Sequence, residues 1–202
     1  MKLLFVADPI ESFKTYKDTT YTMMREATRR GHAITVCEPR HLRWQSGQRV
    51  MAQVRDIALT GDEKNWFTES ARREAALADF DAVLMRKDPP FDAEFIYATH
   101  LLEQAEREGA RVINRPQALR NHPEKLAVME FAQYSVPTLV AREAALIHAF
   151  VDHHRDTIVK PLDGMGGSQI FRVRRDDPNR NVIVETVTGD GARTIMAQRY
   201  IP

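Results

Sequence analysis

The sequence predicts an α/β protein in which an open parallel-sheet, Rossmann-like domain is followed by a smaller α+β lobe. The first observation behind this prediction is the strand–helix–strand spacing of residues 2–37, which is typical of a parallel sheet. The second is a change of rhythm around residues 116–123, after which short helices and strands alternate. The third is a glycine-rich loop that follows an apolar strand ending at Lys160. We place the boundary so that the domains are 1–121 and 122–202.

In the first domain each predicted element is a patterned apolar segment ended by a residue that breaks it. Residues 2–7 form a strand that stops at Asp8-Pro9, because proline lacks the backbone donor a strand needs. Residues 19–30 form a helix that ends at Gly31, a residue that accepts the left-handed conformation of a C-cap. The same reasoning predicts, in chain order, a strand at 33–37, a hairpin around Gly47, a helix near 69–78, a strand at 81–85, a helix whose apolar face runs from Phe91 to Ala105, and a strand at 111–113.

The second domain is predicted to change between helix and strand over shorter stretches. In chain order the expected elements are a helix at 124–132, a strand at 138–140, a helix at 143–153, strands at 157–160 and 169–173, a helix near 180–188 and a strand at 194–198. No low-complexity segment and no internal repeat interrupts this pattern.

Composition and charge argue against several classes of protein. The 202 residues carry 29 basic and 28 acidic side chains, whereas a dedicated nucleic-acid binder usually has a clear basic excess. A single cysteine, Cys37, cannot form an internal disulfide, which favours a reducing compartment. The apolar start at 2–7 is too short for a signal peptide, and no stretch approaches the ~18 apolar residues of a membrane helix. We therefore expect a globular, cytoplasmic protein that binds neither nucleic acid nor membrane.

The glycine-rich loop after Lys160 is the most informative candidate for binding chemistry. Successive glycines let backbone N–H groups turn towards an anion, and a lysine at a strand end adds a point charge. This combination suits the phosphates of a nucleotide. The glycine spacing matches neither a Walker loop nor a dinucleotide fingerprint, and a strand follows the loop instead of a helix. The alternative interpretation is a flexible hairpin loop beside a chance lysine.

A second lysine supports the phosphate interpretation. Lys125 stands at the start of the predicted helix 124–132, 35 residues before Lys160. At this point the sequence resembles the ATP-grasp ligases, which hold ATP between two small sheets with one lysine before a helix, a second on a strand and a glycine-rich lid. Within that superfamily it is most similar to the bacterial glutathione synthetases. The resemblance is carried by MRKDPPFD at 85–92, EFIYAT at 94–99, NRPQ at 114–117, KPLDGMGG at 160–167 and MAQRYIP at 196–202.

The resemblance covers the whole chain and implies an ATP-dependent carboxylate–amine ligase. It assigns residues 1–121 to a substrate-binding, pre-ATP-grasp domain and residues 122–202 to the first lobe of the ATP-grasp domain. In the implied reaction the cysteine carboxylate of γ-glutamylcysteine attacks the γ-phosphate of ATP, and glycine then displaces phosphate to give glutathione. The protein contributes positioning and charge neutralisation rather than covalent chemistry. The implied ATP-binding residues are Lys125, Lys160, Gly164, Met165, Gly166, Gly167, Ser168, Gln198, Arg199, Tyr200 and Ile201.

Three residues of the first domain are candidates for binding the peptide substrate. Arg86 lies just past a strand end, where open α/β sheets bind ligands, and its guanidinium matches a carboxylate. Asp18 and Thr20 precede or begin a helix and could bind polar substrate atoms. The alternatives are a surface ion pair between Arg86 and Asp88, and a simple helix N-cap for Asp18 and Thr20.

The resemblance also implies features that these 202 residues do not supply. A complete enzyme of this family is longer, so we expect the second ATP-grasp sheet, with its ligands for Mg²⁺ or Mn²⁺, to be missing and the chain alone to be inactive. The acidic residues present are scattered and predict no magnesium cage. The family implies a homo-oligomer. The alternatives are another ATP-grasp ligase, which would join a different carboxylate and amine, or a truncated binding module without turnover.

Overall fold

A computed structural model describes residues 1–62 and 64–202. Contacts between residues divide the chain into two compact units. The N-terminal unit comprises Met1–Asp88 and Asp92–Asn121, and the C-terminal unit comprises Pro89–Phe91 and His122–Pro202. Each unit has its own sheet and its own hydrophobic core.

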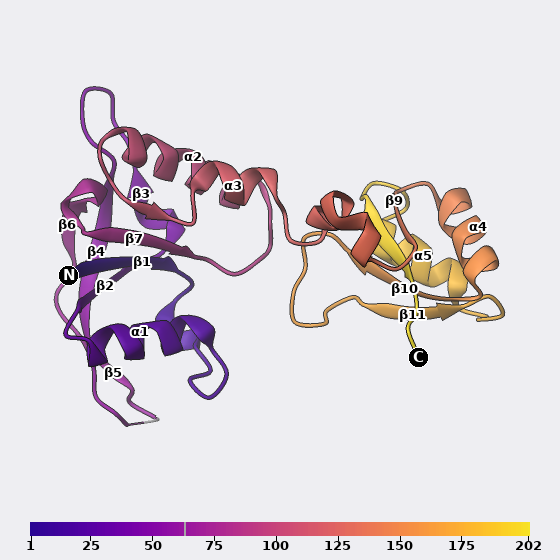
Figure 1. Cartoon of the computed structure of the whole chain (residues 1–202), viewed down its shortest axis with the longest axis horizontal. Coiled ribbons are helices and arrows are strands. Elements are labelled where there is room, and N and C mark those ends of the chain that lie inside the picture. Colours follow the sequence, from indigo (N-terminus) through magenta and orange to yellow (C-terminus); the bar gives the residue numbers. More distant parts are fainter. Residues whose placement is uncertain (63) are drawn as a thin grey trace. The chain divides into compact units, whose positions relative to one another are not determined.

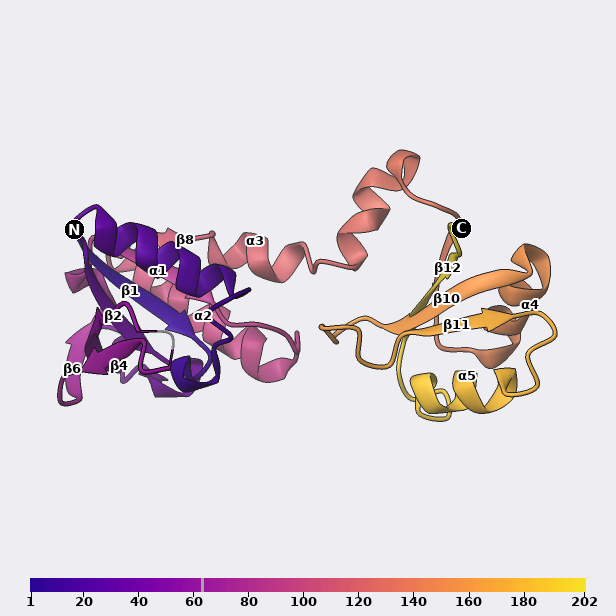
Figure 2. The same cartoon turned by 90° about the horizontal axis from the view of Figure 1, so that it is seen from below.

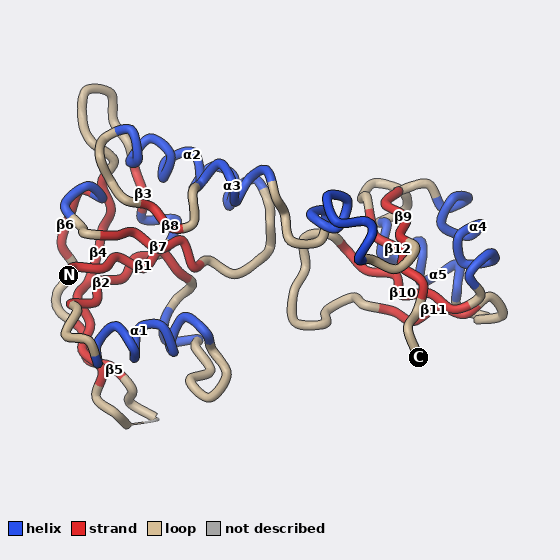
Figure 3. The backbone as a smooth tube through the Cα atoms, in the orientation of Figure 1, coloured by secondary structure: helices blue, strands red, loops and turns tan. Residues whose placement is uncertain are grey.

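The sheet of the N-terminal unit is mixed and mostly parallel along its centre (Figures 1 and 3). Strand β1 pairs in parallel with β2 on one side and with β7 on the other, and β7 pairs in parallel with β8. These four strands confirm the predicted ones. Each is a short apolar run, and β1, β2 and β7 are buried on both faces, whereas in β8 Val112 is buried and Ile113 is exposed. Their bounds are Lys2–Ala7 for β1, Ala33–Cys37 for β2, Ala82–Arg86 for β7 and Val112–Ile113 for β8.

Antiparallel strands extend this sheet beyond β2. The long strand β4 (Met51–Leu59) pairs with β2, and β3 (Leu42–Arg43) pairs with β4 across the turn that contains Gly47, so the predicted hairpin is confirmed. The predicted helix near 69–78 is wrong. That segment forms β5 (Phe67–Glu69), β6 (Arg73–Ala76) and a 3-10 turn, because pairing with β4 buries its alanines and overrides their helix propensity.

Helices cover both faces of this sheet, as the rotated view in Figure 2 also shows. On one face α1 (Thr19–Arg29) packs Met24 and Ala27 against β1, β2 and β7. On the other face α2 (Ala93–Arg107) packs Ala98 and Leu102 against the same strands, and α3 (Pro116–Asn121), which the sequence did not predict, lies beside it. The carboxyl ends of β1 and β7 are therefore flanked by a helix on each side, the place where open α/β sheets bind ligands.

The C-terminal unit is an antiparallel four-stranded sheet with two helices on one face. Its strands lie in the order β11–β10–β12–β9, and apolar side chains of α4 and α5 pack against them. All six elements confirm predicted ones. Their bounds are Thr138–Ala141 for β9, Ala144–His154 for α4, Asp156–Pro161 for β10, Phe171–Arg174 for β11, Arg180–Thr188 for α5 and Ile195–Arg199 for β12.

The other side of this sheet, termed the second face, carries the polar candidates. Val159 and Ala197 point towards α4 and α5, and side chains alternate along a strand, so their neighbours point the opposite way. Residues paired across the strands share a face, which sets the membership of the second face by register. Its members are Thr138, Val140, Asp156, Ile158, Lys160, Arg172, Arg174, Met196 and Gln198.

The helix predicted at 124–132 is a 3-10 helix over Leu126–Tyr134, with non-helical backbone at Phe131. None of its residues is fully buried. Helices in proteins are stabilised mainly by packing an apolar face, so this segment lacks the contacts that would hold a regular α-helix. Lys125 precedes its first residue.

Candidate functional site: a cationic pocket under a glycine-rich loop

The C-terminal unit contains a pocket of about 360 Å³ between the second face and the loop that joins β10 to β11. The structure brings together here both predicted lysines and the whole predicted glycine-rich segment. The residues that line it are Glu124, Lys125, Lys160, Pro161, Gly164, Met165, Gly166, Gly167, Ser168 and Ile170.

The two lysines make this pocket cationic. Burial lowers the pKa of Lys160, and the nearby Lys125 ammonium lowers it further, while the Glu124 carboxylate opposes the shift. Lys125 Nζ donates a hydrogen bond to the carbonyl oxygen of Gly164 at 2.5 Å. Two ammonium groups that destabilise each other in a partly desolvated pocket create a site that favours an anion.

The loop above the lysines depends on glycine for its shape. Gly166 and Gly167 have φ values of 67° and 81°, in the left-handed region that other residues enter only at a cost. No side chain of a neighbour lies within 4 Å of a Cβ built at either position, so backbone conformation alone requires glycine there. A loop of this kind presents backbone N–H groups to a phosphate without side chains in the way.

Four of the implied ATP-binding residues, Gln198, Arg199, Tyr200 and Ile201, lie at the end of β12 and beyond it. Gln198 is on the second face, with Lys160 on the neighbouring strand. Two backbone donors of this segment are already used, because Arg199 N bonds the Pro137 carbonyl at 3.0 Å and Tyr200 N bonds the carbonyl of Asp156 at 2.9 Å. Ile201 follows them and is exposed.

In the N-terminal unit, Arg86 ends β7 at the carboxyl edge of the sheet. Its Nε donates to Thr20 Oγ1 at 3.1 Å and one Nη donates to Thr19 Oγ1 at 2.9 Å. In the part of the chain that the structure describes, Arg86 has no carboxylate within ion-pair distance, so the alternative of an Arg86–Asp88 ion pair is wrong. The hydroxyls hold the guanidinium in place without neutralising its charge, which leaves it available to an anionic group.

Asp18 acts as the N-cap of α1, as the structural alternative proposed. Its Oδ1 accepts a hydrogen bond from Tyr21 N at 2.9 Å, and its backbone is extended. Thr20, in the first turn of the helix, is buried and bonded to Arg86. The structure thus brings Thr20 and Arg86 together and gives Asp18 a role in the helix.

Replacement of Asp18 separates the capping role from a binding role. We expect Asp18→Ala to lower the free energy of unfolding of the N-terminal unit by about 1 kcal/mol, because a helix donor loses its partner, and Asp18→Asn to lower it much less. Urea unfolding followed by tryptophan fluorescence measures this, since both tryptophans, Trp44 and Trp66, lie in that unit. Equal losses in the two variants would contradict the capping assignment.

A groove of about 430 Å³ lies on the α2 side of the same sheet edge. Asp8 at its wall is bonded twice, to Lys87 Nζ at 2.8 Å and to the backbone N–H of Asp88 at 2.9 Å. Burial raises the pKa of the Asp88 carboxyl, and the nearby carboxylates of Asp8 and Asp18 raise it further. The loop that follows β7 therefore concentrates charge of both signs at this edge.

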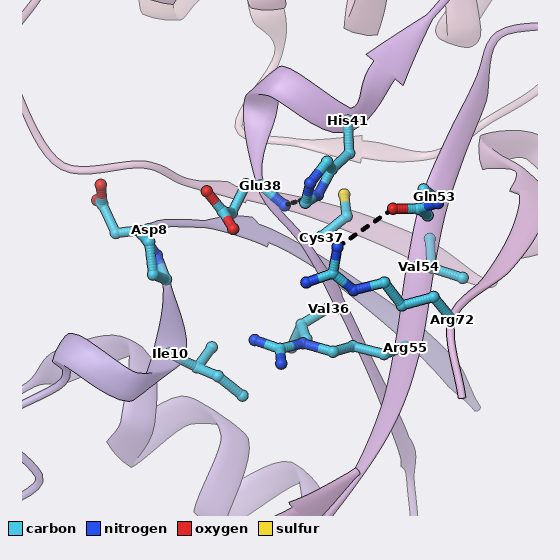
Figure 4. Close-up of a pocket in the computed structure, with 11 residues that line it drawn as sticks. Asp8, Ile10, Val36, Cys37, Glu38, His41, Gln53, Val54, Arg55 and Arg72 are labelled. Atoms are coloured by element: carbon cyan, nitrogen blue, oxygen red, sulfur yellow. Dashed lines mark hydrogen bonds between the residues drawn. The ribbon is translucent and has the colours of Figure 1, made fainter. Parts of the chain in front are cut away.

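A smaller pocket next to this groove is occupied by its own side chains (Figure 4). Arg55 and Arg72 point into it, but Arg55 is ion-paired with Glu11 and Glu69, and Arg72 bonds the side chain of Gln53. About 10 Å³ remains free, room for roughly one water molecule. Burial raises the pKa of the Cys37 thiol there to about 12, so this cysteine is inert. The volume that remains is too small for a substrate-sized group.

Within residues 1–62 and 64–202, no group of three or more histidine, cysteine, aspartate or glutamate side chains is placed to hold a metal ion. None of the helices described there is long and apolar enough to cross a membrane.

Sequence reasoning missed two polar residues, one in the pocket and one on the second face. Glu124 lines the pocket beside Lys125, and Thr138 bonds Gln198 from the neighbouring strand. Glu124 adjoins a residue that was selected, so proximity in sequence could have signalled it. Thr138 is 60 positions from Gln198, and only the register of β9 on β12 brings them together.

An α/β unit followed by an antiparallel lobe with a lysine pair under a glycine-rich loop defines an ATP-grasp protein. Solved structures agree: the RimK domain ATP-grasp protein of Sphaerobacter thermophilus has a TM-score of 0.60 at 21% identity, covering 100% of this chain and 65% of its own. D-cycloserine synthetase has a TM-score of 0.60 at 20% identity, covering 100% of this chain and 60% of its own. Residues 1–120 match the N-terminal domain of prokaryotic glutathione synthetase, and residues 124–202 match the ATP-grasp domain of the same enzyme. The chain belongs to the prokaryotic glutathione synthetase family.

Curated relatives show the same similarity along the whole chain. The glutathione synthetase of Ralstonia nicotianae is 52% identical over 202 residues, which are 100% of this chain and 62% of the relative. That of Nitrosomonas europaea is 50% identical over 206 aligned residues, covering 100% of this chain and 64% of the relative. The chain thus spans less than two thirds of the length of these relatives.

Proposed function

We propose that this chain provides the substrate-binding domain, 1–121, and the first nucleotide-binding lobe, 122–202, of a glutathione synthase. The proposed reaction is the ATP-dependent ligation of γ-glutamylcysteine and glycine to glutathione, ADP and phosphate. The observation that carries the proposal is the pocket in which Lys125 and Lys160 face a glycine-rich loop. The family and the identity of about half the residues to curated glutathione synthetases support the choice of substrates.

The roles proposed for the pocket residues follow from their chemistry. Lys125 and Lys160 bind phosphate oxygens as point charges, and the loop Gly164–Ser168 covers them. The Ser168 N–H already bonds the Met165 carbonyl at 3.3 Å, so the backbone donors for phosphate come from the loop residues before it. An incoming phosphate also compensates the repulsion between the two ammonium groups, which makes binding more favourable than at an isolated lysine. Gln198 and the backbone of residues 199–201 hold the adenine. In that segment the Ile201 N–H is the donor that remains for the base, because those of Arg199 and Tyr200 have partners.

The chemistry proposed for this site proceeds in two displacements. A carboxylate oxygen of γ-glutamylcysteine forms a bond to the γ-phosphorus while the bond to the ADP oxygen breaks. The amine of glycine then attacks the acyl carbon, loses a proton, and phosphate leaves. In both steps negative charge develops on phosphoryl oxygens, which the two lysines stabilise, and a closed loop shields the acyl phosphate from water.

Magnesium or manganese is part of the proposed reaction, but the described residues do not fit a metal site, since they contain no suitable cluster of ligands. We therefore assign the metal to no residue of this chain and derive no step from it. A homo-oligomer and a cytoplasmic location are also proposals, and they rest on the family alone.

For the peptide substrate we propose the carboxyl edge around Arg86. Its guanidinium is fixed by Thr19 and Thr20 and has donors left for a carboxylate, which it can bind in bidentate fashion. Thr20 acts by holding Arg86. Asp18 contributes through the start of α1 and through its proximity to Asp88.

A titration of the ¹⁵N-labelled chain followed by NMR tests both assignments. ATP is expected to shift the backbone signals of Gly164–Ser168, and γ-glutamylcysteine is expected to shift the Arg86 Nε–H signal. Adenosine, which lacks phosphates, serves as the control and is expected to leave the loop signals in place at the same concentration. Absence of shifts in the loop at millimolar ATP would overturn the assignment of the pocket.

A further inference from the structure

The side chain of Gln198 is held by a hydroxyl on the neighbouring strand. Its Nε2 donates to Thr138 Oγ1 at 3.0 Å, and the two residues are directly paired in the register of β9 and β12. Both lie on the second face of the sheet, the face that carries Lys160.

The hydrogen-bond count fixes which end of the Gln198 amide faces Thr138. The Thr138 hydroxyl has one proton, which it donates to the carbonyl oxygen of Val136 at 2.8 Å. Its oxygen therefore accepts the bond from Gln198, with the Ser135 hydroxyl also nearby at 3.3 Å. If the amide were reversed, two acceptor oxygens would face each other unless Thr138 gave up its bond to Val136. The network thus places Gln198 Nε2 towards Thr138 and Oε1 away from it.

Gln198 Oε1 is consequently an unpaired acceptor. Within the described residues it makes no hydrogen bond. The one buried side-chain polar atom without a partner there is His148 Nδ1, so Gln198 Oε1 is unpaired but not buried. It is therefore open to solvent and to a ligand. A hydrogen-bonding group that is fixed before a ligand arrives discriminates between donors and acceptors on that ligand.

We propose that Thr138 is a positioning residue that holds Gln198 Oε1 as a fixed acceptor and thereby selects adenine over 6-oxopurines. The inference rests on the proposed function, in which Gln198 meets the base of the nucleotide. Adenine carries an amino donor at position 6, whereas hypoxanthine and guanine carry a carbonyl acceptor there. A free amide could rotate to suit either group. An amide that Thr138 holds in place instead presents its Oε1 acceptor to the 6-oxo acceptor of such a purine, which is unfavourable.

The experiment compares the affinities of ATP and ITP for the full chain by NMR titration. ITP carries an oxo group in place of the 6-amino group and, in consequence, a proton on N1. The wild-type chain is expected to bind ATP at least about 10-fold more tightly than ITP, since one hydrogen bond is replaced by a repulsive contact. Thr138→Val is expected to lower the ATP/ITP affinity ratio at least about 3-fold, because only the contribution of position 6 depends on Thr138, whereas Thr138→Ser keeps the hydroxyl and the ratio. Val140→Ala, on the same strand and face, is the matched control and should keep the wild-type ratio.

A rescue separates positioning from packing. In the double variant Thr138→Val with Gln198→Glu, both carboxylate oxygens are acceptors, so no positioning is needed and the preference for ATP should return. Should Thr138→Val lose the spectrum of a folded C-terminal unit, Thr138→Ala decides instead, because it removes the same hydroxyl with a smaller side chain and should lower the ratio by a similar factor.

The outcomes distinguish this inference from the function it rests on. If the wild-type chain binds neither nucleotide, the proposed function of the pocket fails and the inference fails with it. If the wild-type chain binds ATP and ITP equally, or if Thr138→Val keeps the wild-type ratio, the inference is overturned while nucleotide binding stands.

Discussion

A polypeptide of residues 1–202, given ATP, magnesium, γ-glutamylcysteine and glycine, is expected to produce no glutathione above the no-enzyme control. The described pocket supplies two lysines and a loop from one sheet, and the described residues offer no metal cluster. Removal of one preorganised charge-stabilising donor typically lowers the rate by ~10²–10³-fold. When several such donors are lacking, the rate is expected to fall below detection. ADP release and glutathione formation, both followed by mass spectrometry, measure this.

A chimaera provides the matched control for that assay. It joins residues 1–202 to the rest of the Ralstonia nicotianae relative. The match covers 62% of that relative, and the chimaera takes from it the part outside the match. Turnover is expected to appear in the chimaera under identical conditions. Glutathione formed by residues 1–202 alone would contradict the prediction, and would mean that two lysines and one loop suffice for the chemistry.

Elements with a clear apolar period and a breaking residue could be predicted from the sequence. Strand β1 ends at the Asp8-Pro9 pair and α1 ends before Gly31, and both were predicted nearly to the residue. The segment 69–78 was wrong because its arginine, glutamate and alanine residues have helix propensity, while pairing with a strand that precedes them in the chain decides its structure. Tertiary pairing of this kind leaves no local signal.

The candidate site shows the same division. Lys160 and its loop are adjacent in sequence, so their proximity could be predicted, and the family resemblance added Lys125. The Thr138–Gln198 bond could not be predicted, because it depends on the register of two paired strands, β9 and β12. A register shift of one residue would turn either side chain to the other face of the sheet. The residue type of Asp18 is compatible with a helix cap and with a ligand, and the bond from Tyr21 N, which the structure supplies, shows the capping role.

Replacement of Lys160 by alanine in the chimaera is expected to lower kcat/KM by ~10²–10³-fold, a loss of about 3–4 kcal/mol of transition-state stabilisation. Lys160 is partly buried and its pKa is lowered by that burial and by Lys125, so its charge acts in a medium where water screens it little. Steady-state rates of ADP release over a range of ATP concentrations measure the effect. The matched control is Lys14→Ala, which removes an exposed ammonium from the N-terminal unit and should change kcat/KM by less than about 2-fold.

Lys160→Arg tests whether charge alone is enough. Arginine keeps the positive charge but presents a planar fork in place of a compact ammonium, and the pocket of about 360 Å³ was formed around the shorter group. We therefore expect the arginine variant to recover part of the activity lost in Lys160→Ala and to remain well below the unsubstituted chimaera. Full activity in Lys160→Ala would show that Lys160 serves the fold of β10 and makes no contact with phosphate.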